Sequence, residues 1–301
     1  MCRGASFVTV YRACEDRRHW IGGTFEVEQC TRCGYARTRP FLSAAEVDLY
    51  YPPSYCCFRP LPPDTGFRKA VRRLIWAPFK LRFGWPFDPL EPERGRNRLL
   101  DVGCGTGEDA RRMAAAGWET WGLEPDREAA AMAVSSGALA SDHLFVGLAE
   151  EAHYPPGSFD LVTMVHVLEH VQSPRAVLER IHGWLSDAGR LKVGLPNFGS
   201  RERRIFGRLW FGLDVPRHLH HFDRGSVTRL LADCGFSVER VVAEPQSSTL
   251  SSSVLHAYDK LIRRRRDYSP PGALGYALLP VAAVFLALGS APTIDVVARR
   301  S

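Results

Sequence analysis

A short apolar segment, Arg98–Val102, runs directly into the glycine-rich stretch Gly-Cys-Gly-Thr-Gly at 103–107. Glycine adopts backbone turns that other residues resist, and without a Cβ it lets a ligand approach the main chain closely. The combination predicts a buried strand, a tight ligand-binding turn and a helix. Thr106 is expected to cap that helix, with Asp109 as its capping-box partner.

Carboxylates surround this turn. Asp101 precedes it, and Glu108 and Asp109 follow it. Glu124 lies about 20 residues further on, at the end of the next predicted strand, where an acid can bind ribose hydroxyls. A dinucleotide enzyme would show Gly-x-Gly-x-x-Gly and place a pyrophosphate at the helix N-terminus. The carboxylates here would repel a pyrophosphate, and they favour a ligand that carries an ammonium and a sulfonium.

Short apolar runs alternate with helical patterns along the chain, which is typical of a parallel sheet covered by helices. Strands are predicted at 97–103, 118–124, 143–147, 159–165, 189–195, 236–243 and 293–300. Helices are predicted at 106–117, 126–137, 174–186 and 225–234. The expected fold class is therefore α/β.

The glycine turn, its acids and the later segment His166-Val-Leu-Glu-His-Val resemble the class I S-adenosylmethionine-dependent methyltransferases over roughly residues 97–244. The resemblance implies a Rossmann-like, seven-stranded methyltransferase sheet whose last strand runs antiparallel. It also implies that Asp101 and Gly103 face the methionine end of S-adenosylmethionine and that Glu124 binds the ribose. The implied cofactor-binding residues are Asp101, Gly103, Cys104, Gly105, Gly107, Glu124, Pro125, Leu148, Ala149, Glu150 and His166.

The loop at 147–150 resembles the segment that closes over adenine in this family. Many relatives carry an acidic residue where Leu148 stands. Recognition of the adenine amino group would then come from backbone groups or from Glu150.

Methyl transfer from a sulfonium is an in-line displacement, so positioning of the acceptor supplies much of the rate. An oxygen acceptor must also lose its proton to a base. Candidate bases are His170, and His218 and His221 in the insertion at 196–224. Arg217 or His218 could bind an acidic acceptor. Two alternatives stay open: a metal held by three histidines with Glu169, or a lid ordered by hydrogen bonds.

Cys30-Thr-Arg-Cys33 is a knuckle of the kind that supplies two thiolates to zinc. Its context resembles the zinc-ribbon-like leader of a methyltransferase subgroup, which usually begins with another Cys-x-x-Cys. Here the expected zinc ligands are Cys2, Cys30 and Cys33, with Cys14 or His19 as alternative third ligands and loss of the metal as a further alternative. The module is expected to recognise or cover the acceptor.

The expected organisation has three parts: the Cys-containing module at 1–60, a basic connector at 61–96 and the methyltransferase domain at 97–301. The domain carries insertions at 196–224 and 245–292. A net charge of +6 fits a nucleic acid, an anionic lipid surface or a phosphorylated substrate as partner.

A charge-free run from Tyr268 to Ile294 follows the arginines at 263–266. The run is long enough to span a bilayer, but prolines interrupt it and the strand at 293–300 must return to the sheet. We therefore expect a packed helical lid, or an interfacial helix in peripheral contact with an anionic membrane. The N-terminus shows no signal-peptide-like apolar core, so a cytoplasmic protein is expected.

The expected function is methylation of a small-molecule, glycan or lipid-linked acceptor, at oxygen. One alternative is a nucleic-acid methyltransferase, which the sequence pI of about 9.0 and the Cys knuckle suggest. The strand at 159–165, however, is not followed by an Asn/Asp-Pro-Pro-Tyr segment. A second alternative is a non-catalytic, membrane-docked protein that binds S-adenosylmethionine.

Overall fold

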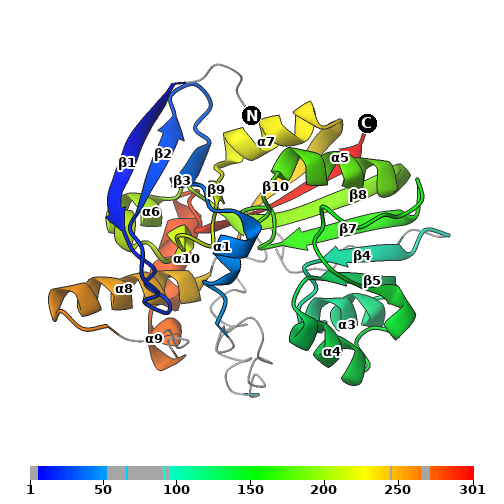
Figure 1. Ribbon diagram of the computed structural model, residues 1–301, viewed down its shortest axis with the longest axis horizontal. Coiled ribbons are helices and arrows are strands. Elements are labelled where there is room, and N and C mark those ends of the chain that lie inside the picture. Colours follow the sequence, from blue (N-terminus) through cyan, green and yellow to red (C-terminus); the bar gives the residue numbers. More distant parts are fainter. Residues whose placement is uncertain (1–5, 53–65, 67–90, 93–94, 245, 266–271) are drawn as a thin grey trace.

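The strands form two sheets, one of seven strands and one of four (Figure 1). The computed structural model describes residues 6–52, 66, 91–92, 95–244, 246–265 and 272–301. Most of the predicted basic connector at 61–96 lies outside these residues.

The seven-stranded sheet has the order β10-β11-β8-β7-β4-β5-β6. The strands are β4 (Arg98–Val102), β5 (Glu119–Glu124), β6 (Leu144–Val146), β7 (Phe159–Val165), β8 (Leu185–Pro196), β10 (Phe236–Glu244) and β11 (Thr293–Arg300). Neighbouring strands from β6 to β8 are parallel, whereas β11 runs antiparallel to both β8 and β10. The predicted seven-stranded α/β sheet with an antiparallel last strand is confirmed.

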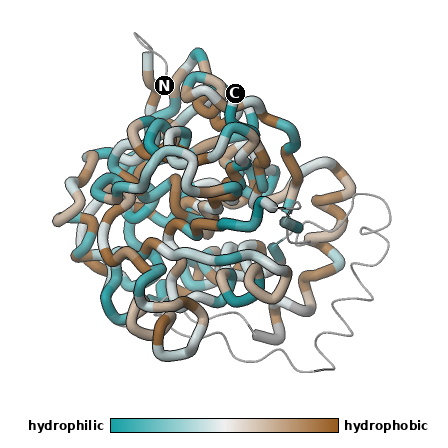
Figure 2. Tube along the Cα trace, turned by 90° about the vertical axis from the view of Figure 1, so that its right-hand side faces the viewer, coloured by the Kyte–Doolittle hydropathy of each residue, from teal (hydrophilic) through white to brown (hydrophobic). Residues whose placement is uncertain are grey.

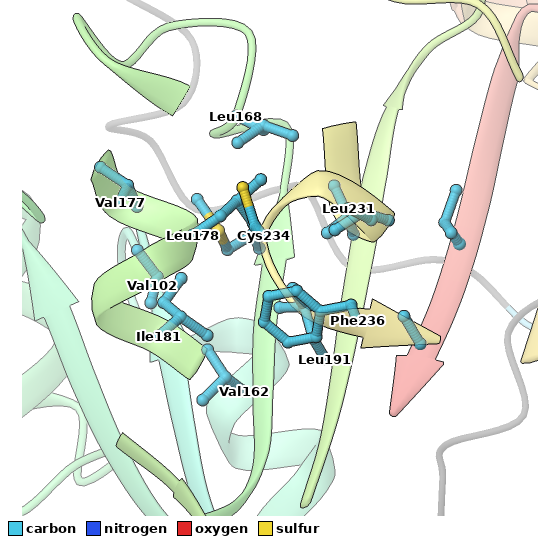
Figure 3. Close-up of a cluster of buried hydrophobic side chains, with 14 of the residues drawn as sticks. Val102, Val162, Leu168, Val177, Leu178, Ile181, Leu191, Leu231, Cys234 and Phe236 are labelled. Atoms are coloured by element: carbon cyan, nitrogen blue, oxygen red, sulfur yellow. The ribbon is translucent and has the colours of Figure 1, made fainter. Parts of the chain in front are cut away.

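Helices cover both faces of this sheet (Figure 1). On one face lie α3 (Glu108–Ala115) and α4 (Arg127–Ser135), and on the other lie α5 (Pro174–Trp184) and α7 (Arg224–Asp233). The main core forms between the sheet and the second pair. Figure 3 shows Val102, Val162 and Leu191 of the sheet packed toward Leu178 and Leu231 of the helices. Along the chain, hydrophobic and hydrophilic residues alternate, as elements with one buried face require (Figure 2).

The four-stranded sheet joins two segments that are distant in sequence. Its order is β1-β2-β3-β9, where β1 is Phe7–Cys14, β2 is Phe25–Cys30, β3 is Ala36–Arg39 and β9 is His220–His221. The short helix α1 (Ala44–Asp48) follows β3. Because β9 comes from the predicted insertion at 196–224, the N-terminal module and the insertion share one sheet.

The second predicted insertion folds into α8 (Ser247–Leu261), α9 (Gly272–Ala277) and α10 (Leu279–Ala287), which follow α6 (Arg201–Phe206) of the first insertion. Short 3₁₀ turns lie at Ser141–His143, Gly207–Leu209 and Phe211–Leu213. Leu279, Ala283 and Leu286 of α10 pack with Leu250 of α8. Across the described ranges, no helix combines the length and the apolar composition needed to cross a membrane.

A buried ion network ties the N-terminal module to the first insertion. The guanidinium of Arg217, whose side chain is completely buried, contacts Asp16 at 2.5 Å and Asp214 at 2.7 Å. It also donates to the carbonyl of Tyr50 at 2.9 Å. A buried cation requires such partners, because its transfer out of water is costly.

We expect Arg217→Ala to destabilise the fold by about 3–5 kcal/mol, because it leaves two buried carboxylates without their cation. Chemical denaturation followed by circular dichroism would measure the change. The control is Arg299→Ala, which removes an exposed partner of Glu239 at 2.9 Å and is expected to cost at most about 1 kcal/mol. Equal losses in the two variants would contradict the assigned role of Arg217.

Candidate cofactor and acceptor site

The glycine turn lies at the carboxyl end of β4 and needs glycine at each of its three glycine positions. Gly103, Gly105 and Gly107 have φ values of +73°, +53° and +80°, a region that other residues rarely adopt. The N–H groups of Gly103 and Cys104 both donate to the carbonyl of Leu123, at 2.7 and 3.1 Å. The turn is thereby fixed against β5.

The predicted cap of the following helix is wrong. Helix α3 begins at Glu108, its N-cap residue is Gly107, and no side chain caps it. The left-handed conformation of Gly107 takes the N-cap position that the prediction gave to Thr106. The first N–H groups of α3 are consequently left without a capping side chain, next to the turn.

Two buried carboxylates flank the turn. Burial, with a contribution from nearby Asp109, raises the pKa of Asp101 to about 7, although Thr163 Oγ1 donates to its Oδ1 at 2.7 Å. Burial also raises the pKa of Glu124. Its Oε2 accepts the N–H of Gly105 at 2.8 Å and its Oε1 accepts that of Asp126 at 2.9 Å. A carboxylate oxygen has two lone pairs, so each oxygen can accept a further hydroxyl.

The other predicted adenine-side residues lie on the neighbouring loops. Pro125 and Leu148 are exposed, whereas Ala149 is buried. Glu150 accepts the backbone N–H of Gln172 at 3.1 Å and thus ties its loop to the segment after β7.

The loop after β7 brings a histidine and a carboxylate together. His166 has a φ of +56°, which is uncommon for a residue with a Cβ, and its Nδ1 lies 3.3 Å from Oε1 of Glu169. Burial alone would raise the pKa of Glu169. The hydrogen bond from His166 and the neighbouring His170 and His218 lower it to about 2, so this buried carboxylate is ionised.

The predicted bases His170 and His218 lie in the same cluster. Their rings meet edge to face with centroids 4.6 Å apart. Nδ1 of His218 hydrogen-bonds to the carbonyl of Gly212 at 3.0 Å, while its Nε2 lies 3.9 Å from Glu169. Within the described residues, Glu169, His170 and His218 form the one group of potential metal ligands, with ligand atoms within 4.8 Å of one another.

His221 lies on β9, and its ring centroid is 6.4 Å from that of His218. Its Nε2 is 3.0 Å from Oγ1 of Thr38, its ring packs at 5.3 Å from that of Phe198, and burial holds its pKa well below the usual range. Tyr51 is a further residue of the site that was not predicted from the sequence, and its hydroxyl lies 2.8 Å from Nδ1 of His170. No local sequence pattern indicates this contact, because the two residues are 119 positions apart.

The predicted zinc knuckle follows β2. Cys30 is buried and Cys33 is partly exposed, while Cys2 lies outside the described residues. The strand register excludes Cys14 as a shared ligand, because Cys14 pairs with Phe25 at the opposite end of the hairpin from Cys30. In the part of the chain that the structure describes, the cysteines therefore supply two neighbouring thiols and no third.

Comparison with known proteins places the chain in a family. A family model described as a methyltransferase domain matches residues 68–241, which is more than half of the chain. The chain therefore belongs to this methyltransferase family. It is an S-adenosylmethionine-dependent methyltransferase with the Rossmann-like sheet described above.

Similar proteins include two that are named ubiquinone biosynthesis O-methyltransferase. That of Bordetella bronchiseptica is 35% identical over 148 residues, which cover 48% of this chain and 61% of that protein. That of Paracidovorax citrulli is 37% identical over 103 residues, covering 33% and 42%. The chain thus matches less than two thirds of the length of these relatives.

Solved structures of similar fold include an S-adenosylmethionine-dependent methyltransferase of Thermotoga maritima, described as a possible histamine N-methyltransferase. It has a TM-score of 0.47 and 17% identity, covering 78% of this chain and 96% of that one. A second, from Mesorhizobium loti, has a TM-score of 0.47 and 20% identity, covering 78% and 98%.

The residues around the turn fit this cofactor. Asp101 is buried and burial raises its pKa, so the ammonium of the methionine end would stabilise its ionised form. Both oxygens of Glu124 keep acceptor capacity toward a ribose diol. A Cβ on Gly103 would meet Cγ2 of Val167 at 2.4 Å, so the turn and the loop after β7 are in close contact.

We expect Gly103→Ala to weaken both the fold and S-adenosylhomocysteine binding, because its Cβ would displace Val167 from the turn. Gly137→Ala is the matched control: its φ of +69° is similar, but its Cβ would meet nothing within 4 Å. The control should lose roughly 1–2 kcal/mol from left-handed strain alone and retain binding. Thermal melts and calorimetry would separate the two; equal losses would refute the contact.

Proposed function

We propose that this methyltransferase transfers a methyl group to a hydroxyl of a small molecule, with His166 as general base. The observation that carries the proposal is the contact between the glycine turn and the loop after β7, which holds the His166–Glu169 pair. The acceptor oxygen must lie in line with the cofactor's methyl group, so a base that takes its proton must also lie close to the cofactor turn.

The cofactor side of the proposal rests on two acids. When bound, S-adenosylmethionine supplies an electrophilic methyl group on a sulfonium. Asp101 would bind the ammonium of the methionine end, and Glu124 would accept hydrogen bonds from the ribose hydroxyls. Gly103, Cys104, Gly105 and Gly107 would form the turn against which it lies, and Pro125, Leu148, Ala149, Glu150 and His166 would border it.

The acceptor side rests on the orientation of His166. Nδ1 of His166 is directed at the ionised Glu169, and its Nε2 lies 3.4 Å from the side-chain amide nitrogen of Gln246. An acceptor hydroxyl would replace Gln246 at this nitrogen and give up its proton to it. Glu169 would then stabilise the imidazolium. His170 and His218 stay candidate bases, but burial lowers the pKa of each, and we assign their rings to packing around Glu169. His221 would position β9.

The small-molecule acceptor is supported by the names of the similar proteins, which are O-methyltransferases. The intact turn and acids disfavour a non-catalytic binding protein. Peripheral membrane contact stays a prediction, for which α10 offers Val281 and Val284 on its exposed side. Zinc at Cys30 and Cys33 also stays a prediction, as do a glycan or lipid-linked acceptor, methylation of nucleic acid and a cytoplasmic location.

Cofactor binding should depend on pH through Asp101. Its carboxyl is protonated below a pKa of about 7 and must be ionised to bind an ammonium, so affinity falls as pH falls. We expect S-adenosylhomocysteine to bind about tenfold more weakly at pH 6 than at pH 8. In titration calorimetry, Asp101→Asn should bind weakly without this pH dependence, and Glu124→Ala should lose binding. Unchanged binding by Glu124→Ala would reject the assigned cofactor site.

We expect His166→Asn to reduce kcat by about 10²- to 10⁴-fold at pH 7, because the acceptor hydroxyl loses its base. Because His166 also borders the cofactor, the affinity of the variant for S-adenosylhomocysteine should fall, but far less than kcat does. The rate should recover at high pH, where the acceptor ionises unaided. Transfer of labelled methyl to a panel of phenols and sugar hydroxyls would measure this. His153→Asn, an exposed histidine on another loop, is the control. A wild-type rate in His166→Asn would exclude His166 as the base.

A further inference from the structure

An arginine-rich pocket lies where the N-terminal module meets the first insertion and α8. It is partly open to solvent, and Arg17, Arg18 and Arg208 line it with the carboxylates Glu15 and Asp214. The methyl transfer proposed above makes no use of the three arginines. Three guanidinium groups in one pocket repel one another, which is electrostatically unfavourable unless an anion offsets their charge.

The carboxylates of the pocket do not match its cations closely. Asp214 is already shared, since its Oδ1 accepts from Arg217 at 2.7 Å and its Oδ2 lies 3.5 Å from Arg18. Glu15 approaches the guanidinium of Arg17 only to 3.8 Å, which is longer than a hydrogen bond. The side chain of Arg17 is nevertheless only 13% exposed, and burial lowers its pKa.

Two further donors in the pocket have weak acceptors or none. Arg208 reaches the carbonyls of Arg12 and Ala13 only at 3.4 and 3.3 Å. The indole N–H of Trp210, a residue 2% exposed that lines the pocket, has no hydrogen-bond partner among the described residues. His256 adds no charge, because burial lowers its pKa to about 4. Three guanidinium groups and this indole N–H thus line the pocket with two carboxylates, of which Asp214 also has one oxygen, Oδ2, without a hydrogen-bond partner among the described residues.

We propose that this pocket binds a phosphoryl-type oxyanion, held by the guanidinium groups of Arg17 and Arg208 and by the indole N–H of Trp210. Planar guanidinium forks match phosphate oxygens, and hydrogen bonds between charged partners are stronger than neutral ones. Arg265 lies 5.2 Å above the ring of Trp20 and 3.9 Å from Glu15, where it adds a cation to the rim.

The pocket is connected to the acceptor-side cluster. Oδ2 of Asp214, which lines the pocket, lies 3.9 Å from Nε2 of His218, and His218 contacts His170. Side-chain contacts therefore join the pocket to the proposed methyl-transfer site. This link rests on the proposed function, whereas oxyanion binding itself does not. The same chemistry is presented by the headgroup of an anionic lipid.

Calorimetry of the full chain, saturated with S-adenosylhomocysteine, tests the proposal with inorganic pyrophosphate as a soluble probe. Co-sedimentation with phosphatidylglycerol vesicles, against phosphatidylcholine vesicles, tests the lipid source. The variant is Arg17→Gln with Arg208→Gln. Its matched control is Arg229→Gln with Arg240→Gln, which removes two exposed charges from α7 and β10. Thermal melts report folding, and Arg17→Gln alone serves if the double variant unfolds.

We expect the pocket variant to weaken pyrophosphate binding at least tenfold and the control to leave it unchanged. Loss confined to vesicle binding would support the site and assign it to a lipid headgroup. Absence of binding by the wild type to either probe, or equal weakening in variant and control, would overturn the proposal. Failure of the wild type to bind S-adenosylhomocysteine would instead reject the cofactor site. The pyrophosphate titration would then still test the pocket by itself.

Discussion

Arg217 is a completely buried cation, and the acceptor side of the molecule is assembled around it. Its donors reach Asp16 of the N-terminal module and Asp214 of the first insertion, so these segments must fold together. The same insertion donates two backbone N–H groups, from Leu219 and His220, to the carbonyl of Glu169. The N-terminal sheet is therefore part of the structure that holds the loop after β7, and with it the proposed base.

Two buried carboxylates at the site show how neighbours decide a charge. Burial by itself acts to raise the pKa of both Asp101 and Glu169. The pKa of Asp101 does rise, to about 7, whereas the neighbours of Glu169 outweigh burial and lower its pKa to about 2. Asp101 has another acid, Asp109, nearby, whereas Glu169 is enclosed by histidines. Divergent pKa values in one site separate the roles of its acids. Asp101 would pair with a cation that the ligand brings, and Glu169 pairs with a histidine of the protein itself.

The sequence predicted what depends on local pattern. The strands expected at 159–165 and 293–300 agree to the residue with β7 and β11, because alternating apolar and β-branched residues define them. The helix start at Thr106 failed, since a left-handed glycine is not distinguishable from a capped start by residue type. The pairing of β3 with β9 and the contact of Arg217 with Asp16 join residues roughly 200 apart, and no local signal announces either.

The partner of this basic chain also depends on long-range contacts, because they decide where the arginines gather. A net charge of +6 is equally compatible with nucleic acid, an anionic lipid surface or a phosphorylated small molecule. Binding to a nucleic-acid backbone requires cations spread along an extended surface. Arg17, Arg18 and Arg208 converge instead on one pocket bordered by Trp210 and Phe211. This convergence favours a phosphorylated small molecule or a single headgroup over a polymer.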